Sequence, residues 1–336
     1  MKPEHYDSLD GKSVLVTGGT GSFGKAFVRR VLEKHKLRRL IVYSRDELKQ
    51  FEMQQQFSQE NYPCMRYFIG DVRDKNRLEL ALRDVQVVVH AAAMKQVPAA
   101  EYNPSECIHT NVLGAENLVM ASITSGVERL IALSTDKACN PINLYGASKL
   151  ASDKIFVSAN RLSGIEGTVF SCVRYGNVLG SRGSVVPVFE RLINDGVTEL
   201  PITDARMTRF WITLQYGVEF VLSCLKTMRG GEIFVPKIPS MSIVDVAKTM
   251  LPKMRPNIIG IRPGEKLHEV MITEDDARNT VELPDRYIIE PNPITRPSHL
   301  DRENAMSVED GFRYSSDNNN DWLDADQLRH LIAESR

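Results

Sequence analysis

Residues 13–24 read SVLVTGGTGSFG, and a helical pattern follows over residues 25–34. The order is therefore a β-branched strand, a glycine-rich turn and the start of a helix. Such a turn lets the backbone approach the pyrophosphate of a dinucleotide, and the helix N-terminus favours negative charge. A tight turn without a ligand is the alternative, but the flanking strand and helix favour a dinucleotide site. The residues predicted to contact the cofactor here are Gly18, Thr20, Gly21, Ser22, Phe23 and Gly24.

Short β-branched runs alternate with longer helical patterns through most of the chain, as in βαβ units. The predicted strands are 13–17, 39–43, 66–69, 85–90, 129–134, 168–174 and 232–235. Several are apolar throughout, so helices should cover both faces of the sheet. We predict an α/β fold, a doubly wound parallel sheet of the Rossmann type with a smaller C-terminal lobe. Residues 1–175 would mainly bind the cofactor and residues 176–336 mainly the substrate, with some chain crossing back to the sheet.

The composition is that of an ordinary globular protein, with 42 Lys and Arg against 43 Asp and Glu in 336 residues. This balance argues against a nucleic-acid partner, which requires a basic surface. The five cysteines are widely spaced and fit a reducing compartment. The first six residues have no apolar signal core, and no run of about 18 apolar residues could span a bilayer. We therefore expect a cytoplasmic protein without a membrane partner.

The end of the second predicted strand indicates the type of cofactor. An acidic residue there would hold the ribose hydroxyls of NAD. Instead the strand ends in Ser44 and Arg45, and a guanidinium suits the 2′-phosphate of NADP. Asp46 is acidic, so NAD remains possible as the cofactor. A further alternative is that Arg45 and Asp46 merely begin the next helix as solvated charges.

Four further residues are predicted to line the cofactor. Asp71 and Val72 end the third strand, where a carboxylate can accept a hydrogen bond from the adenine amino group. Ala91 follows the fourth strand, where a small residue permits close approach, although tight packing would need the same. Lys95 could meet a phosphate or a ribose hydroxyl, or lie on the surface.

The fifth predicted strand leads to the strongest catalytic signal. Thr135, Asp136 and Lys137 follow it, and Tyr145 and Lys149 come after a loop. A spacing of four places Tyr145 and Lys149 on one face of a helix, so the ammonium can lower the phenol pKa and hold the nicotinamide ribose. Such a phenolate can take a proton from a hydroxyl as hydride leaves the same carbon. A surface salt bridge is the alternative for Asp136 and Lys137.

The second half supplies Arg209 and Arg262, which suit a diphosphate because an arginine can bind it with two hydrogen bonds. The alternative is that each arginine pairs with a carboxylate, for example Arg262 with Glu265. The histidines do not have metal-ligand spacing, so we expect no metal.

The chain resembles the extended short-chain dehydrogenase/reductases. More narrowly, residues 17–24, 43–49, 134–149, 262–269 and 314–322 resemble the inverting UDP-N-acetylglucosamine 4,6-dehydratases of pseudaminic acid biosynthesis. The similarity extends from about residue 10 to the end. It implies that NADP stays bound and is regenerated in each turnover, that UDP-N-acetylglucosamine is the substrate, and that the protein forms a homo-oligomer.

The resemblance also implies roles for individual residues. Asp136 and Lys137 distinguish this group, because retaining dehydratases carry a glutamate after the aspartate and 4-epimerases lack the acid–base pair. The further cofactor residues that it implies are Glu47 and Lys49. The substrate residues that it implies are Lys95, Asn177, Val178, Arg209, Arg262 and Glu265.

The implied reaction begins when Tyr145, assisted by Lys149, removes the C4 hydroxyl proton. Lys137 then removes the C5 proton and Asp136 protonates the departing C6 hydroxyl. We expect burial or the nearby Lys149 to keep part of Lys137 neutral, as a base requires. A UDP-sugar 4-epimerase and a non-enzymatic NADP-sensing protein are the alternative functions.

Overall fold

Ten strands form the main sheet in the part of the chain that the computed structural model describes, residues 8–181, 183–253, 255–291, 302 and 304–335. Their order is β16-β14-β15-β10-β6-β5-β4-β1-β2-β3. From β10 to β3 all neighbours are parallel. The parallel strands are β1 (Ser13–Thr17), β2 (Arg39–Ser44), β3 (Met65–Ile69), β4 (Val87–His90), β5 (Arg129–Thr135), β6 (Val169–Tyr175) and β10 (Ile233–Pro236). These closely match the predicted strands, so the doubly wound sheet is confirmed.

The far edge of the sheet departs from the parallel pattern. There β15 (Arg286–Ile289) pairs antiparallel with β10, followed by β14 (Thr280–Glu282) and β16 (Met306–Ser307). A short turn joins β14 to β15, and such a turn can connect only antiparallel neighbours. The prediction of an entirely parallel sheet was therefore incomplete.

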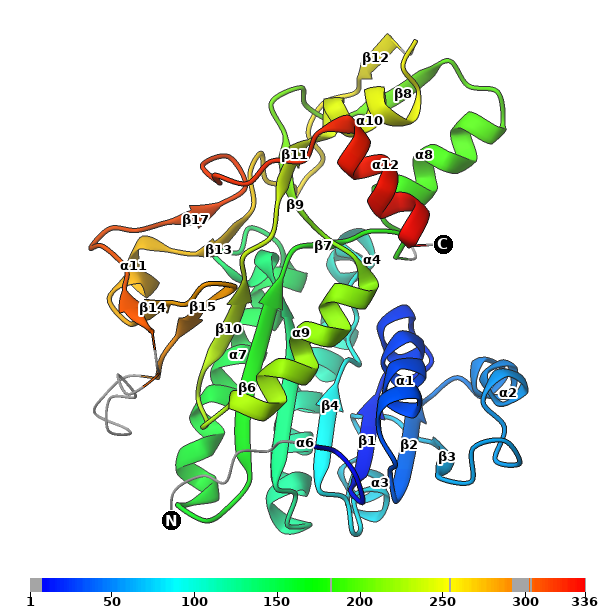
Figure 1. The fold of residues 1–336 in the computed structure, drawn as a ribbon, viewed down its shortest axis with the longest axis vertical. Helices are drawn as coiled ribbons and strands as arrows, with labels where there is room; N and C mark the ends of the chain where they lie inside the picture. Colours follow the sequence, from blue (N-terminus) through cyan, green and yellow to red (C-terminus); the bar gives the residue numbers. More distant parts are fainter. Residues whose placement is uncertain (1–7, 182, 254, 292–301, 303, 336) are drawn as a thin grey trace.

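Helices cover both faces of the sheet (Figure 1). On one face α1 (Ser22–Lys34) packs beside α9 (Leu214–Thr227), and on the other α3 (Lys75–Ala81), α6 (Gly114–Thr124) and α7 (Leu144–Ser163) lie side by side. Every residue of β1 is buried, as a strand between two helical layers requires. The remaining helices of this lobe are α2 (Glu47–Gln56), α4 (Val97–Tyr102) and α5 (Pro104–Ile108), with a π-helical turn at His109–Leu113.

A smaller lobe stands at the end of the sheet to which β6 leads (Figure 1). It has its own core, which includes Phe189, Trp211 and Leu328. Its elements are β7 (Asn177–Val178), α8 (Val185–Asn194), β8 (Glu199–Ile202), β9 (Thr208–Ile212), β11 (Ser240–Ser242), α10 (Ile243–Met250), β12 (Arg255–Ile258) and α12 (Ala325–Glu334). Between the lobes lie β13 (Val270–Ile272), α11 (Glu274–Ala277) and β17 (Tyr314–Ser315).

The second half of the chain contributes to both lobes, since β10, β14 and β15 join the main sheet. None of the helices in the described part of the chain combines the length and hydropathy that a membrane span needs. The six N-terminal residues without a signal core lie outside the described residues.

Candidate active site

The glycine turn between β1 and α1 forms a cradle of open backbone, because side chains larger than glycine would not fit at its key positions. Gly18 has φ +65°, and a Cβ there would lie 2.8 Å from the Ala92 nitrogen. A Cβ on Gly24 would collide with the Gly19 backbone, so α1 can approach the turn only with glycine there. The helix begins at Ser22 with no side chain capping it from Gly21. Its first N–H groups and the open backbone fit a dinucleotide pyrophosphate.

The residues assigned to the cofactor near the end of β2 have different structural roles. The side chain of Asp46 caps α2 by accepting a hydrogen bond from the Lys49 nitrogen, and its carboxylate also pairs with Lys49 Nζ. Asp46 therefore begins the helix, as the alternative proposed for it, whereas Arg45 lies before the helix. Ser44 is buried and its hydroxyl bonds that of Thr20 at 2.8 Å, which ties β2 to the glycine turn.

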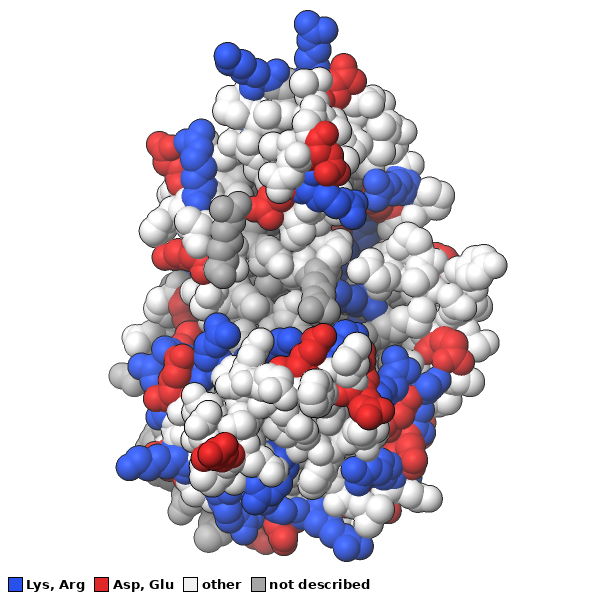
Figure 2. All heavy atoms as spheres, turned by 90° about the vertical axis from the view of Figure 1, so that its right-hand side faces the viewer, with Lys and Arg blue, Asp and Glu red and all other residues white. Residues whose placement is uncertain are grey.

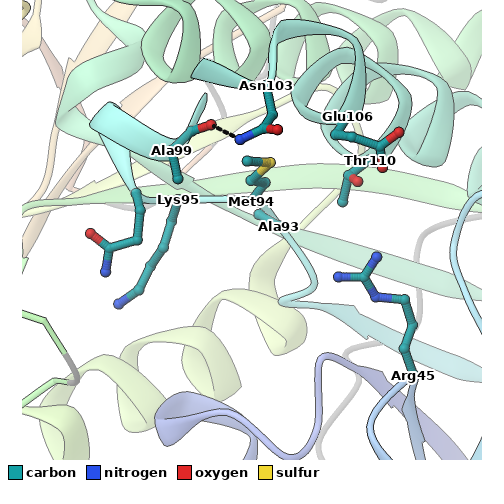
Figure 3. Close-up of a pocket in the computed structure, with 9 residues that line it drawn as sticks. Arg45, Ala93, Met94, Lys95, Ala99, Asn103, Glu106 and Thr110 are labelled. Carbon is teal, nitrogen blue, oxygen red and sulfur yellow. Dashed lines mark hydrogen bonds between the residues drawn. The ribbon is translucent and has the colours of Figure 1, made fainter. Parts of the chain in front are cut away.

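Arg45 lines a cavity of about 450 Å³ between β2 and the segment after β4. Figure 3 shows its guanidinium pointing toward the segment that carries Glu106 and Thr110, with Lys95 on the other side of the cavity. Arg45 Nη1 lies 3.5 Å from the Asp71 carboxylate, which Arg73 also binds. The cation is exposed and open to a further anion.

Thr135 ends β5, and a short 3₁₀ helix, Asp136–Ala138, follows directly. Asp136 is fully buried and accepts hydrogen bonds from the Thr135 hydroxyl at 2.9 Å and from Lys137 Nζ at 3.0 Å. Lys137 Nζ also lies 3.3 Å from a carboxylate oxygen of Glu269 and 3.4 Å from Asn177 Oδ1. Asp136 is thus buried and Lys137 partly buried, so the pair is not a surface salt bridge.

Helix α7 brings Tyr145 and Lys149 to the same place. Asn143 caps the helix by accepting from the Gly146 nitrogen at 2.7 Å, and a Cβ on Gly146 would strike the Lys137 carbonyl. The glycine after Tyr145 therefore lets α7 press against the turn that carries Lys137. The Tyr145 hydroxyl is close enough to Thr135 and Lys137 for both to lower its pKa against the effect of burial, and the buried Lys149 donates to the Leu133 carbonyl at 2.6 Å.

Electrostatics in this cluster differ from the expectation. Burial raises the pKa of Tyr145 to about 12, so the side chain is a phenol at neutral pH. Burial lowers the pKa of Lys137, but the negative charges of Asp136 and Glu269 outweigh it, and the pKa is raised overall. The prediction of a partly neutral Lys137 was therefore wrong for the unliganded protein. The second carboxylate, Glu269, is far from Lys137 in the sequence, so its effect could not be predicted. Burial also raises the pKa of Asp136 and lowers that of Lys149.

The residues assigned to the substrate diphosphate lie in two places. Asn177 and Arg209 are near Lys137, and Arg209 Nε lies 3.8 Å from the Glu269 carboxylate. The Nη atoms of Arg209 donate to backbone carbonyls of residues 208, 266 and 267. Arg262 is exposed and pairs with Glu265 at 3.8 Å, as the alternative proposed.

The turn of residues 262–265 nevertheless borders the site. The Gly264 carbonyl accepts a hydrogen bond from Asn143 Nδ2 at 2.8 Å, two residues before Tyr145. The partly exposed Val178 lies beside Asn177 in β7, whereas Val72 is buried in the main core. Lys95 is close enough to Lys137 for the ammonium charge to contribute to a lowered pKa of Lys95, after the larger effect of burial.

Glu269 is the site residue that sequence reasoning did not assign. It is 2% exposed, and its carboxylate faces Lys137 from the other lobe. The signal available was a lone acidic residue directly before the apolar run 270–272. Only the fold shows that it meets Lys137.

Residues 14–291 match the family of polysaccharide biosynthesis proteins. The chain belongs to this family. Among the relatives of this chain, the UDP-N-acetylglucosamine 4,6-dehydratase (inverting) of Campylobacter jejuni is 57% identical over 331 residues, which cover 96% of this chain and 97% of that protein. The UDP-glucose 4-epimerase of Rickettsia canadensis is 41% identical over 285 residues, 83% of this chain and 82% of that protein.

Among solved structures, the X-ray structure of Pen from Bacillus thuringiensis matches this family member with a TM-score of 0.89. Its sequence is 36% identical, and the match covers 98% of this chain and 99% of that chain. The similarity therefore includes both lobes.

On the face drawn in Figure 2 the surface is hollowed between the lobes, and basic side chains lie in the hollow. Acidic and basic side chains are mixed over the rest of that face. Such a hollow suits an anionic ligand.

Proposed function

We propose that this protein removes water from UDP-N-acetylglucosamine and inverts C5, forming UDP-2-acetamido-2,6-dideoxy-β-L-arabino-hexos-4-ulose. The pair of buried Asp136 and partly buried Lys137, next to Tyr145, is the observation that carries the proposal. It supplies an acid and a base beside a dehydrogenase-type tyrosine, which a dehydratase needs and a simple dehydrogenase does not. The 57% identity with the Campylobacter jejuni enzyme supports the same assignment.

We infer that the cradle of Gly18 and Gly24, together with Arg45, would hold a nicotinamide dinucleotide, NADP in preference to NAD. Such a cofactor would supply the site with a reversible hydride acceptor for C4 and C6 and with a positive charge that would favour the Tyr145 phenolate. Lys149 would hold the nicotinamide ribose from its place on α7.

The chain's own residues then move the protons. Tyr145 takes the C4 hydroxyl proton, and the resulting ketone acidifies C5. One proton transfer from Lys137 Nζ to Asp136 Oδ1, across 3.0 Å, gives a neutral amine and a protonated carboxyl together. Lys137 removes the C5 proton, Asp136 protonates the leaving C6 hydroxyl, and solvent returns a proton to the opposite face of C5.

We predict that the purified protein dehydrates UDP-N-acetylglucosamine without added reductant, because the hydride taken from C4 returns to C6. NMR of the product and absorbance of reduced nicotinamide measure the two quantities. The 6-deoxy-4-keto sugar should form while free NADPH stays constant. Stoichiometric NADPH would identify a net dehydrogenase and contradict the proposal.

The second candidate is a UDP-sugar 4-epimerase, which the 41% identical Rickettsia canadensis relative favours. An epimerase would use Tyr145 and Lys149 but leave Asp136 and Lys137 without a role. The same NMR spectrum separates the two, since an epimerase product keeps its C6 hydroxyl.

We predict that Arg45→Ala weakens NADP binding by about 10- to 100-fold and leaves NAD binding nearly unchanged. The reason is the loss of one charge-assisted contact with the 2′-phosphate, about 1.5–3 kcal/mol. Isothermal titration of each cofactor measures the effect. Arg77→Ala is the matched control, because Arg77 lies nearby but donates to the Ile69 carbonyl. Equal loss for both cofactors would mean that Arg45 does not bind the 2′-phosphate.

A further inference from the structure

Lys137 is held between two carboxylates that come from different lobes. Its ammonium lies 3.0 Å from Asp136 Oδ1 and 3.3 Å from Glu269 Oε1. Both carboxylates are almost completely buried. Asp136 Oδ2 and Glu269 Oε2 are buried without a hydrogen-bond partner, which is costly for structure alone.

The place of Glu269 is fixed by the C-terminal segment. β17 pairs antiparallel with β13, and the backbone of Ser316 donates to the Glu269 carbonyl at 2.8 Å. The Ser316 hydroxyl accepts from the Glu269 nitrogen at 2.9 Å and bonds the Thr208 hydroxyl at 2.7 Å. Thr208 in turn bonds His268 Nδ1 at 2.8 Å. Ser316 therefore holds Glu269 by both its backbone N–H and its backbone carbonyl.

The charges around the pair come from several elements. Lys137, Arg209 and Lys266 lower the pKa of Glu269, although burial raises it, so the carboxylate is ionised. Asp136 faces it across Lys137. Lys95 and Tyr145 also interact with Lys137.

We propose that Glu269, held by Ser316, is a positioning residue that places Lys137 against Asp136 and sets the pH range in which this pair removes water from the substrate. This inference rests on the proposed dehydratase function. It gives the C-terminal segment, residues 314–316, a part in catalysis.

The physical reason is the negative charge of Glu269. In its active form the Asp136–Lys137 pair holds one proton. Losing that proton at high pH leaves a carboxylate beside a neutral amine, and gaining a second proton at low pH gives a carboxylic acid beside an ammonium; both of these forms are inactive. A neighbouring anion makes both groups hold their protons more tightly, so both apparent pKa values of the pair lie higher than they would without it. Removing that anion lowers both, and the active window moves to lower pH.

The test is the pH profile of single-turnover water loss in Glu269→Gln, with bound cofactor and UDP-N-acetylglucosamine. We expect the acidic limb of the profile, which reports protonation of the pair, to move to lower pH by about one unit or more. Reduction of the bound nicotinamide by C4 oxidation should persist, because Glu269 does not contact Tyr145. Glu269→Asp keeps the charge at a shorter reach and should lower the rate without moving the profile.

Glu290→Gln is the matched control. Glu290 is also a largely buried carboxylate, accepts from Arg302 Nε at 2.9 Å and has a buried oxygen without a hydrogen-bond partner. Its profile should stay that of the parent. A Glu269→Gln profile that does not move, or moves to higher pH, would overturn the inference even if the rate falls.

Ser316→Ala covers the case in which Glu269→Gln does not fold, since it loosens Glu269 and keeps the carboxylate. We expect a several-fold slower water loss with an unmoved profile, and the parental rate would overturn the inference. If the parent itself forms no 4-keto product, the proposed function fails instead. The two failures are thus distinguishable.

Discussion

Lys137→Met is expected to bind UDP-N-acetylglucosamine nearly as well as the parent and to form the 6-deoxy-4-keto product about 10³-fold more slowly. Methionine keeps the length of the side chain and removes the base, and general acid–base groups contribute about 10²- to 10⁴-fold. Tyr145 and Lys149 are unchanged, so C4 oxidation should continue. Reduced nicotinamide should then accumulate on the variant, which absorbance in a single turnover measures.

The matched control is Lys237→Met, in which a partly buried lysine loses its pairing with Glu282 in the main sheet. Its rate of dehydration should equal that of the parent. This comparison separates the loss of the base from the general cost of removing a paired lysine.

Labelling tests the same residue in a second way. In deuterated water the parent should place deuterium at C5 and yield the inverted sugar, since the proton leaves one face and returns from solvent to the other. Retained C5 configuration, or dehydration by Lys137→Met at the parental rate, would mean that Asp136 and Lys137 are not the acid–base couple.

Signals local in the sequence predicted the nucleotide-binding part of the fold well. The strands of the parallel sheet are continuous apolar runs between helical patterns, and the glycines of the cradle stand directly between a strand and a helix. The antiparallel edge of β14, β15 and β16 was missed, because these strands are short and pair through a turn that resembles any other loop.

The charge state of the candidate site could not be predicted, because it depends on contacts between distant residues. Lys137 looked like a lysine that burial would make neutral, yet Glu269, far away in the sequence, gives it a second anion. Arg209 is close to this pair, whereas Arg262 pairs with Glu265 on the surface. Charge type alone does not distinguish these two arginines.

Several expectations stay predictions. The division of the chain near residue 176, the preference for NADP, the association of copies of the chain and its cellular location depend on ligands, partners or conditions outside a single chain. The cofactor preference rests on Arg45 alone and is settled by titration.

Tyr145→Phe is expected to abolish reduction of the bound nicotinamide and to lower product formation by about 10²- to 10⁴-fold. The reason is that C4 oxidation cannot begin without a group to take the hydroxyl proton, and the Tyr145 hydroxyl, close to Thr135 and Lys137, is the group placed for it. The variant should therefore show no absorbance of reduced nicotinamide, whereas Lys137→Met should accumulate it. Tyr67→Phe is the control, because its hydroxyl donates to the Phe57 carbonyl away from the site. If Tyr145→Phe accumulated reduced nicotinamide as Lys137→Met does, the C4 proton would have another acceptor and the assignment of the first step to Tyr145 would be wrong.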